Sequence, residues 1–492
     1  MLFNSYIFIL AFLPLVVIGY YLFNKYFQTN RAALFFLIAA SFVFYGYYNW
    51  TYLLILITSI AANWLAIILM RKKEDTFFRK TVMIAGILFN TGLIFYFKYY
   101  DFFIKNINTV FDTDFNVRNI VLPLGISFFT FQQISFVVDA YRHETDDYNL
   151  VEYMAFVSFF PQLVAGPIVL HDELVPQFRD ESKRTLNWEK MSRGLYLFAV
   201  GLAKKVLIAD IFGIAVNWGY SNVDYLSTID AIVVIISYTL QIYFDFSGYC
   251  DMASGIASMF HIGLPMNFDS PYKAASIIEF WKRWHMTLTR FLRRYIYFPL
   301  GGSKKGEIRT YINIMIVFIV SGIWHGANWT FIIWGGIHGA AQCLNRRFKK
   351  QWEKCHLAFQ WLMTFTFVSF TWVIFRADSM AQAGKIIWRS INFRNLAISP
   401  ELIECFNTVE IKAVKWLLSY WDAWNIFSAK YYINGFVMFS CILAGLFIVL
   451  NKENAQRKTV NYHIGTALWT AVLIVWGIMS LSGVSTFLYF NF

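Results

Sequence analysis

Charged residues are scarce in this sequence. Only 15% of its 492 residues are Asp, Glu, Lys or Arg, whereas 58% are hydrophobic and 20% are aromatic. A soluble domain carries about 25% charged residues, and a soluble chain of this length would normally divide into several domains joined by polar linkers. The sequence has no Pro/Ser-rich linker, no low-complexity tract and no internal repeat. The composition therefore excludes an ordinary soluble multidomain protein.

Cysteines and common catalytic motifs are also few. The five cysteines are scattered without CxxC spacing, so neither a disulfide scaffold nor a zinc site is indicated; they are Cys250, Cys343, Cys355, Cys405 and Cys441. Neither GxSxG nor HExxH is present, which argues against a hydrolase elbow and a zinc protease. Gly301–Gly306 is not a Walker A sequence, and a plain turn is a simpler interpretation than a phosphate cradle. We expect no bound metal or resident cofactor.

Apolar runs of membrane-spanning length are abundant instead, separated by short clusters of charge. Runs of about 20 residues match the hydrocarbon thickness of a bilayer. The first run, around Tyr6–Phe23, lacks a basic n-region and an A-x-A-type cleavage site, so we expect a retained helix. The pattern predicts an all-α, polytopic integral membrane protein with about eleven or twelve transmembrane helices.

The net charge of +12 is concentrated in connections between these runs. Basic residues of membrane chains gather in cytoplasmic loops, so the charge does not indicate a nucleic-acid partner. The first connection, with Lys25 and Arg31, and the third, over residues 71–80, are therefore placed in the cytoplasm. The last apolar run, Ile464–Leu481, then crosses outward and leaves an aromatic tail, residues 487–492, on the external face.

Two stretches differ from the spanning runs. Val151–Leu170 is interrupted by Pro161 and a Gly-Pro pair. Irregular backbone at membrane depth must be buried in protein or line a cavity, so a spanning helix and a re-entrant element are equally compatible with this stretch. In Ile277–Leu300, aromatic residues recur at helical spacing between basic ones, which predicts an amphipathic helix at the cytoplasmic interface. Residues 261–310 contain nine Lys or Arg and three Asp or Glu, which lipid headgroup contacts alone could explain.

Ionisable residues inside apolar runs are the informative ones, because each is costly there. Asp245 and Asp251 interrupt one run, and a buried polar network is a simpler interpretation than a cation site. His285 follows Trp284 on the predicted amphipathic helix, where a histidine more often packs than reacts.

His325 is the strongest single candidate. It ends an apolar run, and glycines flank the Trp-His pair on both sides. Small residues allow close approach, and histidine exchanges protons near neutral pH; from the residues alone, catalysis and helix packing are equally supported. His338 lies thirteen residues further on and would face another direction on a continuous helix, so it is assigned to a polar network.

In their order, these segments resemble the membrane-bound O-acyltransferase family, and within it the bacterial branch containing the membrane subunit of alginate O-acetylation. The matching segments are Leu122–Gln132, Ala165–Pro167, Tyr243–Tyr249, Phe280–His285, Gly322–Gly326 and Trp372–Arg376. Each is weak alone, whereas the ordered set is specific. The resemblance implies one membrane-embedded acyltransferase domain over 1–492, with N-terminal helices (1–120), a family core (121–380) and C-terminal helices ending in the tail (381–492).

The resemblance implies a role for each histidine. The family's catalytic histidine falls on His325, and its second polar position, which is Asn, Asp or His depending on the branch, falls on His285. In such enzymes both positions face a central tunnel through the bilayer. Trp284, Trp324 and Asn328 are then expected to contact substrate.

The terminal Phe-x-Tyr-Phe-x-Phe resembles the ending of several cell-envelope acyltransfer proteins, including a small partner in D-alanylation of teichoic acids. The tyrosine there is proposed to carry the acyl group transiently, and it corresponds to Tyr489. An interfacial aromatic anchor is an equal alternative, since Tyr and Phe favour the headgroup boundary.

The resemblance implies a multi-pass bacterial inner-membrane enzyme that moves an acyl group, most simply acetyl, from cytoplasmic acyl-CoA to an envelope polysaccharide. His325 would be the general base, and His285 would polarise the thioester carbonyl or orient His325. The phosphates of CoA would meet basic side chains, namely Lys282, Arg283, Arg290, Lys304 and Lys305. A periplasmic or extracellular SGNH-hydrolase-like acetyltransferase is the expected protein partner.

Several alternatives stay open. The acceptor is alginate, another exopolysaccharide, peptidoglycan or teichoic acid. D-alanyl transfer from a carrier protein to teichoic acid is the nearest competitor within the class. A polysaccharide or lipid transporter would also be polytopic with intramembrane Asp and His, but transporters often contain an internal repeat. A structural scaffold would tolerate the loss of both histidines.

Overall fold

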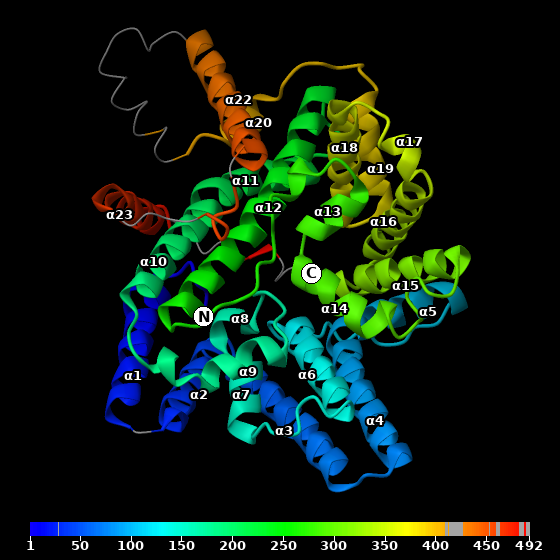
Figure 1. Cartoon of the computed structure of the whole chain (residues 1–492). Coiled ribbons are helices and arrows are strands. Elements are labelled where there is room, and N and C mark those ends of the chain that lie inside the picture. The colour runs from blue at the N-terminus through cyan, green and yellow to red at the C-terminus, as the bar shows by residue number, and fades with distance from the viewer. Residues whose placement is uncertain are drawn as a thin grey trace.

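The computed structural model describes residues 1–27, 29–408, 412, 427–451, 453–458, 463–481 and 487–488. Helices form the whole of the regular structure in these residues, and no strand is present among them (Figure 1). Most of their buried apolar side chains form one continuous cluster that extends from Met1 to Leu488. The predicted all-α membrane fold class is confirmed.

Four long helices open the chain. They are α1 (Leu13–Tyr26), preceded by a π-helical turn η1 (Phe8–Phe12), α2 (Asn30–Gly46), α3 (Trp50–Lys72) and α4 (Thr76–Ile94), which continues through the π-helical turn η2 (Phe95–Tyr99) into α5 (Tyr100–Phe111). Asn49 and Asp75 cap α3 and α4 by accepting backbone N–H groups. The α1–α2 and α3–α4 connections lie at the same edge of Figure 1, so the first and third loops share a side, as predicted.

The proline-interrupted stretch is irregular and buried. After α6 (Ile126–Tyr141) come α7 (Leu150–Ser158), α8 (Phe160–Leu163), α9 (His171–Arg179) and the 3-10 turn η3 (Glu181–Arg184). All but two of residues 151–170 are buried, and the helix breaks at Phe159. The stretch is therefore not one continuous spanning helix, and its irregular backbone is enclosed by protein as membrane depth requires.

A single long helix occupies the centre of the bundle. The segments around it are α10 (Trp188–Ala203), the π-helical turn η4 (Lys204–Ala209) and α11 (Asp210–Ser221), followed by the central α12 (Thr228–Met259) itself. Most residues of α12 are buried. Figure 1 shows α12 crossing the molecule beside α10 and α11. A helix that is apolar and buried on all sides forms the core of its domain.

The expected continuous amphipathic helix over 277–300 is wrong in one respect. It is divided into α13 (Ile277–Arg283), α14 (Met286–Leu292) and the π-helical turn η6 (Arg293–Tyr297), after the 3-10 turn η5 (Pro271–Lys273). The break lies at His285, which has left-handed backbone angles, φ 45° and ψ 51°. The Met286 N–H leaves the helical pattern and donates to the Asn267 carbonyl at 2.9 Å.

The remaining helices complete the bundle. They are α15 (Glu307–His325), α16 (Trp329–Arg347), α17 (Lys349–Trp352), α18 (Leu357–Arg376), α19 (Met380–Ile391), α20 (Pro400–Glu404), α22 (Phe427–Asn451) and α23 (Ile464–Met479). Helices α15 and α16 pack closely because glycines face each other: a Cβ on Gly322 would lie 2.3 Å from the Phe331 carbonyl, and one on Gly335 equally near the Phe318 carbonyl. Small residues permit such approach between membrane helices.

Seven described helices are long and apolar enough to cross a bilayer, and α2 and α23 are apolar but shorter. The predicted count of eleven or twelve is therefore not reached on length and hydropathy among the described residues. One reason is that α6 and α10 have only 16 residues each. Another is that Lys204, Lys205 and Asp210 interrupt the helical run from α10 to α11.

Candidate active site

His325 is the last residue of α15, and aromatic rings enclose it. Its side chain is buried, and its ring centroid lies 4.9 Å from that of Trp324, 5.3 Å from Trp334 and 5.1 Å from Phe375. A Cβ on Gly326, the next residue, would meet the Phe331 ring at 2.2 Å. Only glycine leaves room at this position for the backbone to pass next to the Phe331 ring.

His285 meets His325 in the core, forty residues away in the sequence. The two ring centroids are 6.4 Å apart. The left-handed backbone directs His285 inward, against Phe246 at 4.8 Å and Trp324 at 6.0 Å between centroids. His285 lies between two short helices, outside the candidate spans, and its burial lowers its pKa to about 3. The ring is therefore neutral at physiological pH.

Asn267, which the sequence analysis missed, fixes the tautomer of His285. Its Oδ1 accepts the backbone N–H of Thr287 at 3.2 Å and the Thr287 hydroxyl at 2.9 Å. A backbone N–H can only donate, so this amide atom is the oxygen. His285 Nδ1, 3.1 Å from the same oxygen, must then carry the ring proton, which leaves Nε2 as the hydrogen-bond acceptor.

Lys98 is a second residue that the sequence analysis missed. It lies in η2, and its ammonium group donates to the carbonyls of Trp324 and His325 at 2.8 and 2.9 Å. A lysine inside a long apolar run is costly, and this cost could have identified Lys98 from the sequence as a candidate functional residue.

The other predicted contacts have clear neighbours. The Trp324 indole donates to the Ser127 carbonyl at 3.3 Å, and Trp284 packs on Trp372 at 4.9 Å. Asn328 caps α16 by accepting the Thr330 N–H at 3.2 Å. His338 accepts from the Trp281 indole at Nδ1 and lies 2.9 Å from the Thr371 hydroxyl at Nε2, so both of its nitrogens are engaged away from His325.

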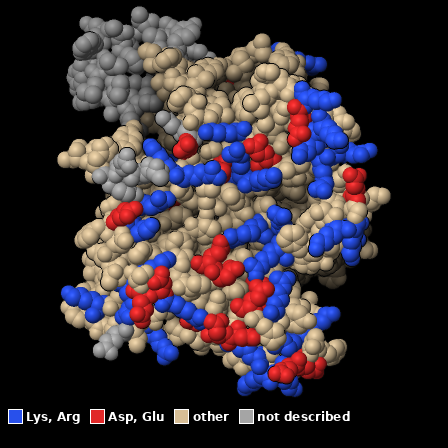
Figure 2. All heavy atoms as spheres, in the orientation of Figure 1, with Lys and Arg blue, Asp and Glu red and all other residues tan. Residues whose placement is uncertain are grey.

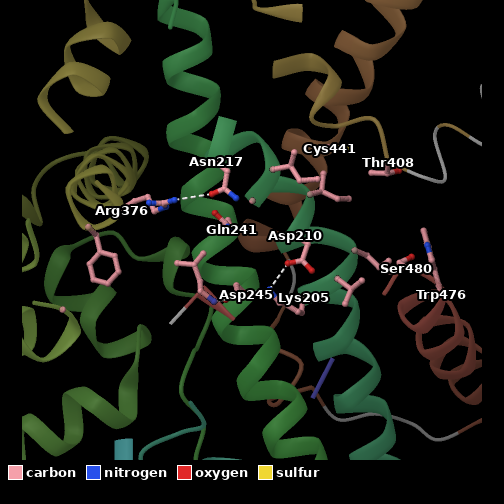
Figure 3. Close-up of a pocket in the computed structure, with 18 of the residues that line it drawn as sticks. Lys205, Asp210, Asn217, Gln241, Asp245, Arg376, Thr408, Cys441, Trp476 and Ser480 are labelled. Carbon is pink, nitrogen blue, oxygen red and sulfur yellow. Dashed lines mark hydrogen bonds and ion pairs between the residues drawn. The ribbon is translucent and has the colours of Figure 1, made fainter. Parts of the chain in front are cut away.

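A cavity of about 2010 Å³ reaches the residues that follow His325. Gly326, Asn328 and Phe375 line one part of it, and Lys205 and Asp245 line another. Figure 3 shows the second part, where Lys205 lies between carboxylates. The predicted tunnel through the bilayer stays a prediction.

Asp245 and Asp251 form buried ion pairs with two adjacent lysines of η4. Lys205 lies 2.6 Å from Asp245 and 2.8 Å from Asp210. Lys204 lies 2.6 Å from Asp251, whose other oxygen accepts from the Gln456 side-chain amide at 3.0 Å. Each acid therefore has a lysine as its neighbour, which fits a buried polar network better than a cation site.

The described part of the tail is packed within the bundle, and its expected place on the external side of the membrane stays a prediction. Phe487 and Leu488 are buried; Phe487 stacks on Tyr249 at 4.7 Å, and the Leu488 N–H donates to Asp245 at 2.9 Å. At these two residues the tail lies inside the bundle, because α12 supplies both an aromatic surface and a carboxylate acceptor. Tyr489 lies outside the described residues.

Lys and Arg gather over α9, α13 and α14 on the face shown in Figure 2, with Asp and Glu among them. Arg283 pairs with Glu279 at 2.8 Å, and Arg290 pairs with Glu173. The other three predicted phosphate ligands, Lys282, Lys304 and Lys305, are exposed. None of the ion pairs within the described part of the chain includes these lysines.

One acidic cluster on this face has the spacing of metal ligands. Asp139, Glu144 and His171 offer donor atoms within 4.8 Å of one another. Arg294, however, lies 3.2 Å from Asp139 and 2.6 Å from Glu144. The guanidinium thus supplies the positive charge there, and the cluster is an ion-pair network.

In this helical membrane bundle, two buried histidines lie close to a cavity, which makes them the candidate site of a membrane-embedded enzyme. Residues 44–381 match the family model of MBOAT, the membrane-bound O-acyltransferase family, and the chain belongs to that family. The resemblance drawn from the ordered motifs is confirmed, and the protein is an O-acyltransferase.

Individual relatives support this assignment. The peptidoglycan O-acetyltransferase of Helicobacter pylori is 36% identical over 525 aligned residues, which cover 100% of this chain and 98% of that protein. The probable alginate O-acetylase AlgI of Azotobacter vinelandii is 36% identical over 406 residues, 81% of this chain and 80% of that protein. The teichoic acid D-alanyltransferase of Bacillus subtilis is 27% identical over 285 residues, 52% of this chain and 69% of that protein.

Proposed function

We propose that this enzyme moves an acetyl group from cytoplasmic acetyl-CoA across the inner membrane of a bacterial cell to an envelope polysaccharide, and that the polysaccharide is peptidoglycan. The meeting of His285 and His325 in an aromatic enclosure carries the proposal. Peptidoglycan is favoured as acceptor because a peptidoglycan O-acetyltransferase matches the whole chain, whereas an alginate O-acetylase matches 81% of it and a D-alanyltransferase 52%.

His325 acts as the general base. It takes the proton of the attacking hydroxyl while the hydroxyl oxygen bonds to the thioester carbonyl carbon. The carbon–sulfur bond then breaks, and the CoA thiolate leaves with the proton returned by His325. The rings of Trp324, Trp334 and Phe375 exclude water, which limits wasteful hydrolysis.

His285 orients the reacting groups. Because its Nδ1–H donates to Asn267, its Nε2 can accept a hydrogen bond from the attacking hydroxyl or from a ring N–H of His325. A neutral ring in this tautomer has no second N–H to polarise a thioester carbonyl. Of the two roles that the family resemblance implied, orientation is therefore the one that this geometry favours.

Exposed lysines provide the docking charge for CoA. Lys282, Lys304 and Lys305 meet the phosphates as point charges, while Arg283 and Arg290 keep their carboxylate partners. The acyl end enters the bundle from this face, which is the cytoplasmic one by its basic loops.

Tyr489 receives the acetyl group first and passes it onward. The two residues before it are held in the core, by Asp245 and Tyr249, so the tail is anchored next to the proposed nucleophile. A periplasmic SGNH-hydrolase-like acetyltransferase then accepts the group. Direct attack by a sugar hydroxyl or by a serine of that partner is the alternative.

Mass spectrometry after incubation with isotopically labelled acetyl-CoA tests the proposal. We compare wild type, His325→Ala and Tyr489→Phe, with exposed His143→Ala and Tyr225→Phe as matched controls. The expected result is label on Tyr489 that is lost in His325→Ala, with label unchanged in both controls. The loss of a general base lowers the rate by about 10²–10⁴-fold.

The other outcomes separate the parts of the proposal. Consumption of acetyl-CoA at the wild-type rate by His325→Ala would contradict the base assignment. Label in base-released acetate from peptidoglycan, with none on Tyr489, would replace the relay by direct transfer. Intact acetyl-CoA together with transfer from a D-alanyl carrier protein would favour the teichoic acid alternative.

A further inference from the structure

Lys98 places an ionisable amine at the candidate active site. It lies in a helical run of 36 residues, Thr76–Phe111, that is apolar enough to span a bilayer. Its side chain is half-buried and lines both the cavity of about 2010 Å³ and a second one of about 390 Å³. An ionisable group inside such an apolar run is expensive and usually functional.

The ammonium group of Lys98 binds the end of the helix that carries His325. It donates to the carbonyls of Trp324 and His325 at 2.8 and 2.9 Å, and lies 3.5 Å from the Ser127 hydroxyl. All three partners are uncharged oxygens. Within the described part of the chain, Lys98 belongs to no ion pair with a carboxylate. Its charge is thus directed at the helix end rather than at an acid.

The C-terminal end of α15 is an unfavourable place for acyl transfer unless its partial negative charge is neutralised. The last carbonyls of a helix lack intrahelical partners and carry about half a negative charge. Acyl transfer develops negative charge on the carbonyl oxygen of the substrate. A negative helix end beside the base would disfavour the negative charge that develops on the substrate oxygen. Charge-assisted hydrogen bonds from Lys98 neutralise the helix end and also fix the backbone of His325.

We propose that Lys98 is a positioning residue for O-acyl transfer, which holds the backbone of His325 and neutralises the end of α15. The proposal rests on the proposed role of His325 as the base. It predicts that the charge of residue 98, and not only its hydrogen bonds, determines the rate of the chemical step.

Tyr99 offers a matched control at the same helix end. Its hydroxyl donates to the Ile323 carbonyl, so Tyr99→Phe removes one bond to α15 without changing charge. Lys98→Gln keeps an N–H donor and removes the charge, whereas Lys98→Arg keeps the charge.

The test measures kcat and KM for acetyl-CoA by thiol release, with the full chain in liposomes and thermal unfolding followed in parallel. We expect Lys98→Gln to lower kcat by about 10²-fold with an unchanged KM. We expect Lys98→Arg to recover most of the rate and Tyr99→Phe to resemble wild type.

Wild-type kcat in Lys98→Gln would overturn the proposal, and so would a fall in kcat in Tyr99→Phe equal to that in Lys98→Gln. The proposal would also fail if Lys98→Arg folded and Lys98→Gln did not accumulate, because the charge would then serve folding. The base assignment fails separately, through an active His325→Ala.

Discussion

The Nδ1 atom of His285 lies 3.1 Å from the Oδ1 atom of Asn267, and this contact sets which ring nitrogen of His285 carries the proton. The amide oxygen is identified by the backbone N–H of Thr287, which also donates to it. A loop residue therefore decides that Nε2 is the acceptor nitrogen of His285.

Replacing Asn267 should impair catalysis without abolishing the fold. In Asn267→Ala, His285 loses its acceptor and can turn or change tautomer, so we expect kcat to fall about 10²-fold with a small change in KM. Cys250→Ala removes the neighbouring contact of the Asn267 amide, 3.4 Å in length, and serves as the control. Equal kcat in Asn267→Ala and wild type would exclude the positioning role.

The lowered pKa of His285, about 3, predicts how stability depends on pH. The unfolded chain binds a proton at this residue below about pH 6.5, whereas the folded chain does not until near pH 3. The free energy of unfolding therefore falls as the pH drops through this window. In detergent, the Tm of wild type should fall further than that of His285→Asn between about pH 7.5 and about pH 5. Parallel curves would contradict the assignment.

Lysines and arginines of the charged face should respond differently to substitution. The triple variant Lys282→Ala, Lys304→Ala, Lys305→Ala should raise KM for acetyl-CoA by about tenfold, an effect that weakens in high salt. Arg290→Ala should mainly lower Tm, because Glu173 loses its partner. The same triple substitution at exposed Lys72, Lys73 and Lys80 is the control. An equal rise in KM for both triples would show that general charge, not a site, attracts the donor.

The ion pair between Asp245 and Lys205 should be required for stability. Asp245→Asn leaves Lys205 with Asp210 alone and weakens the bond to Leu488, so we expect a loss of about 1–3 kcal/mol. Adding Lys205→Met should restore part of the loss, because the buried charge is then removed. A double-mutant cycle of thermal or denaturant unfolding measures the coupling; additive losses would mean that the pair does not act as a unit.

The membrane fold was predictable because the length of apolar runs can be read directly from the sequence. The candidate site could be proposed only through the ordered motifs, since spacing alone supported packing and catalysis equally for His325. The break at His285 was not predictable, because it depends on bonds from Asn267 in a separate loop.

Other misses have physical causes of the same kind. The rule that singled out Asp245 and His325 applies equally to Lys98, Lys204 and Lys205, which also lie in apolar helices. Their partners, however, are distant in the sequence and become visible only in the fold. The burial of Phe487 and Leu488 was not predicted, because Asp245, which accepts the Leu488 N–H, is likewise far away in the chain.

The left-handed backbone of His285, φ 45° and ψ 51°, limits which amino acids evolution can place there. Most side chains are strained in this conformation, whereas Asn, Asp and His are several-fold enriched in it among residues other than glycine. The second polar position that the family resemblance assigned to His285 was expected to hold one of these same three residue types. Backbone geometry and hydrogen-bonding chemistry therefore act as two independent filters on one position, and Asn is the replacement most compatible with both.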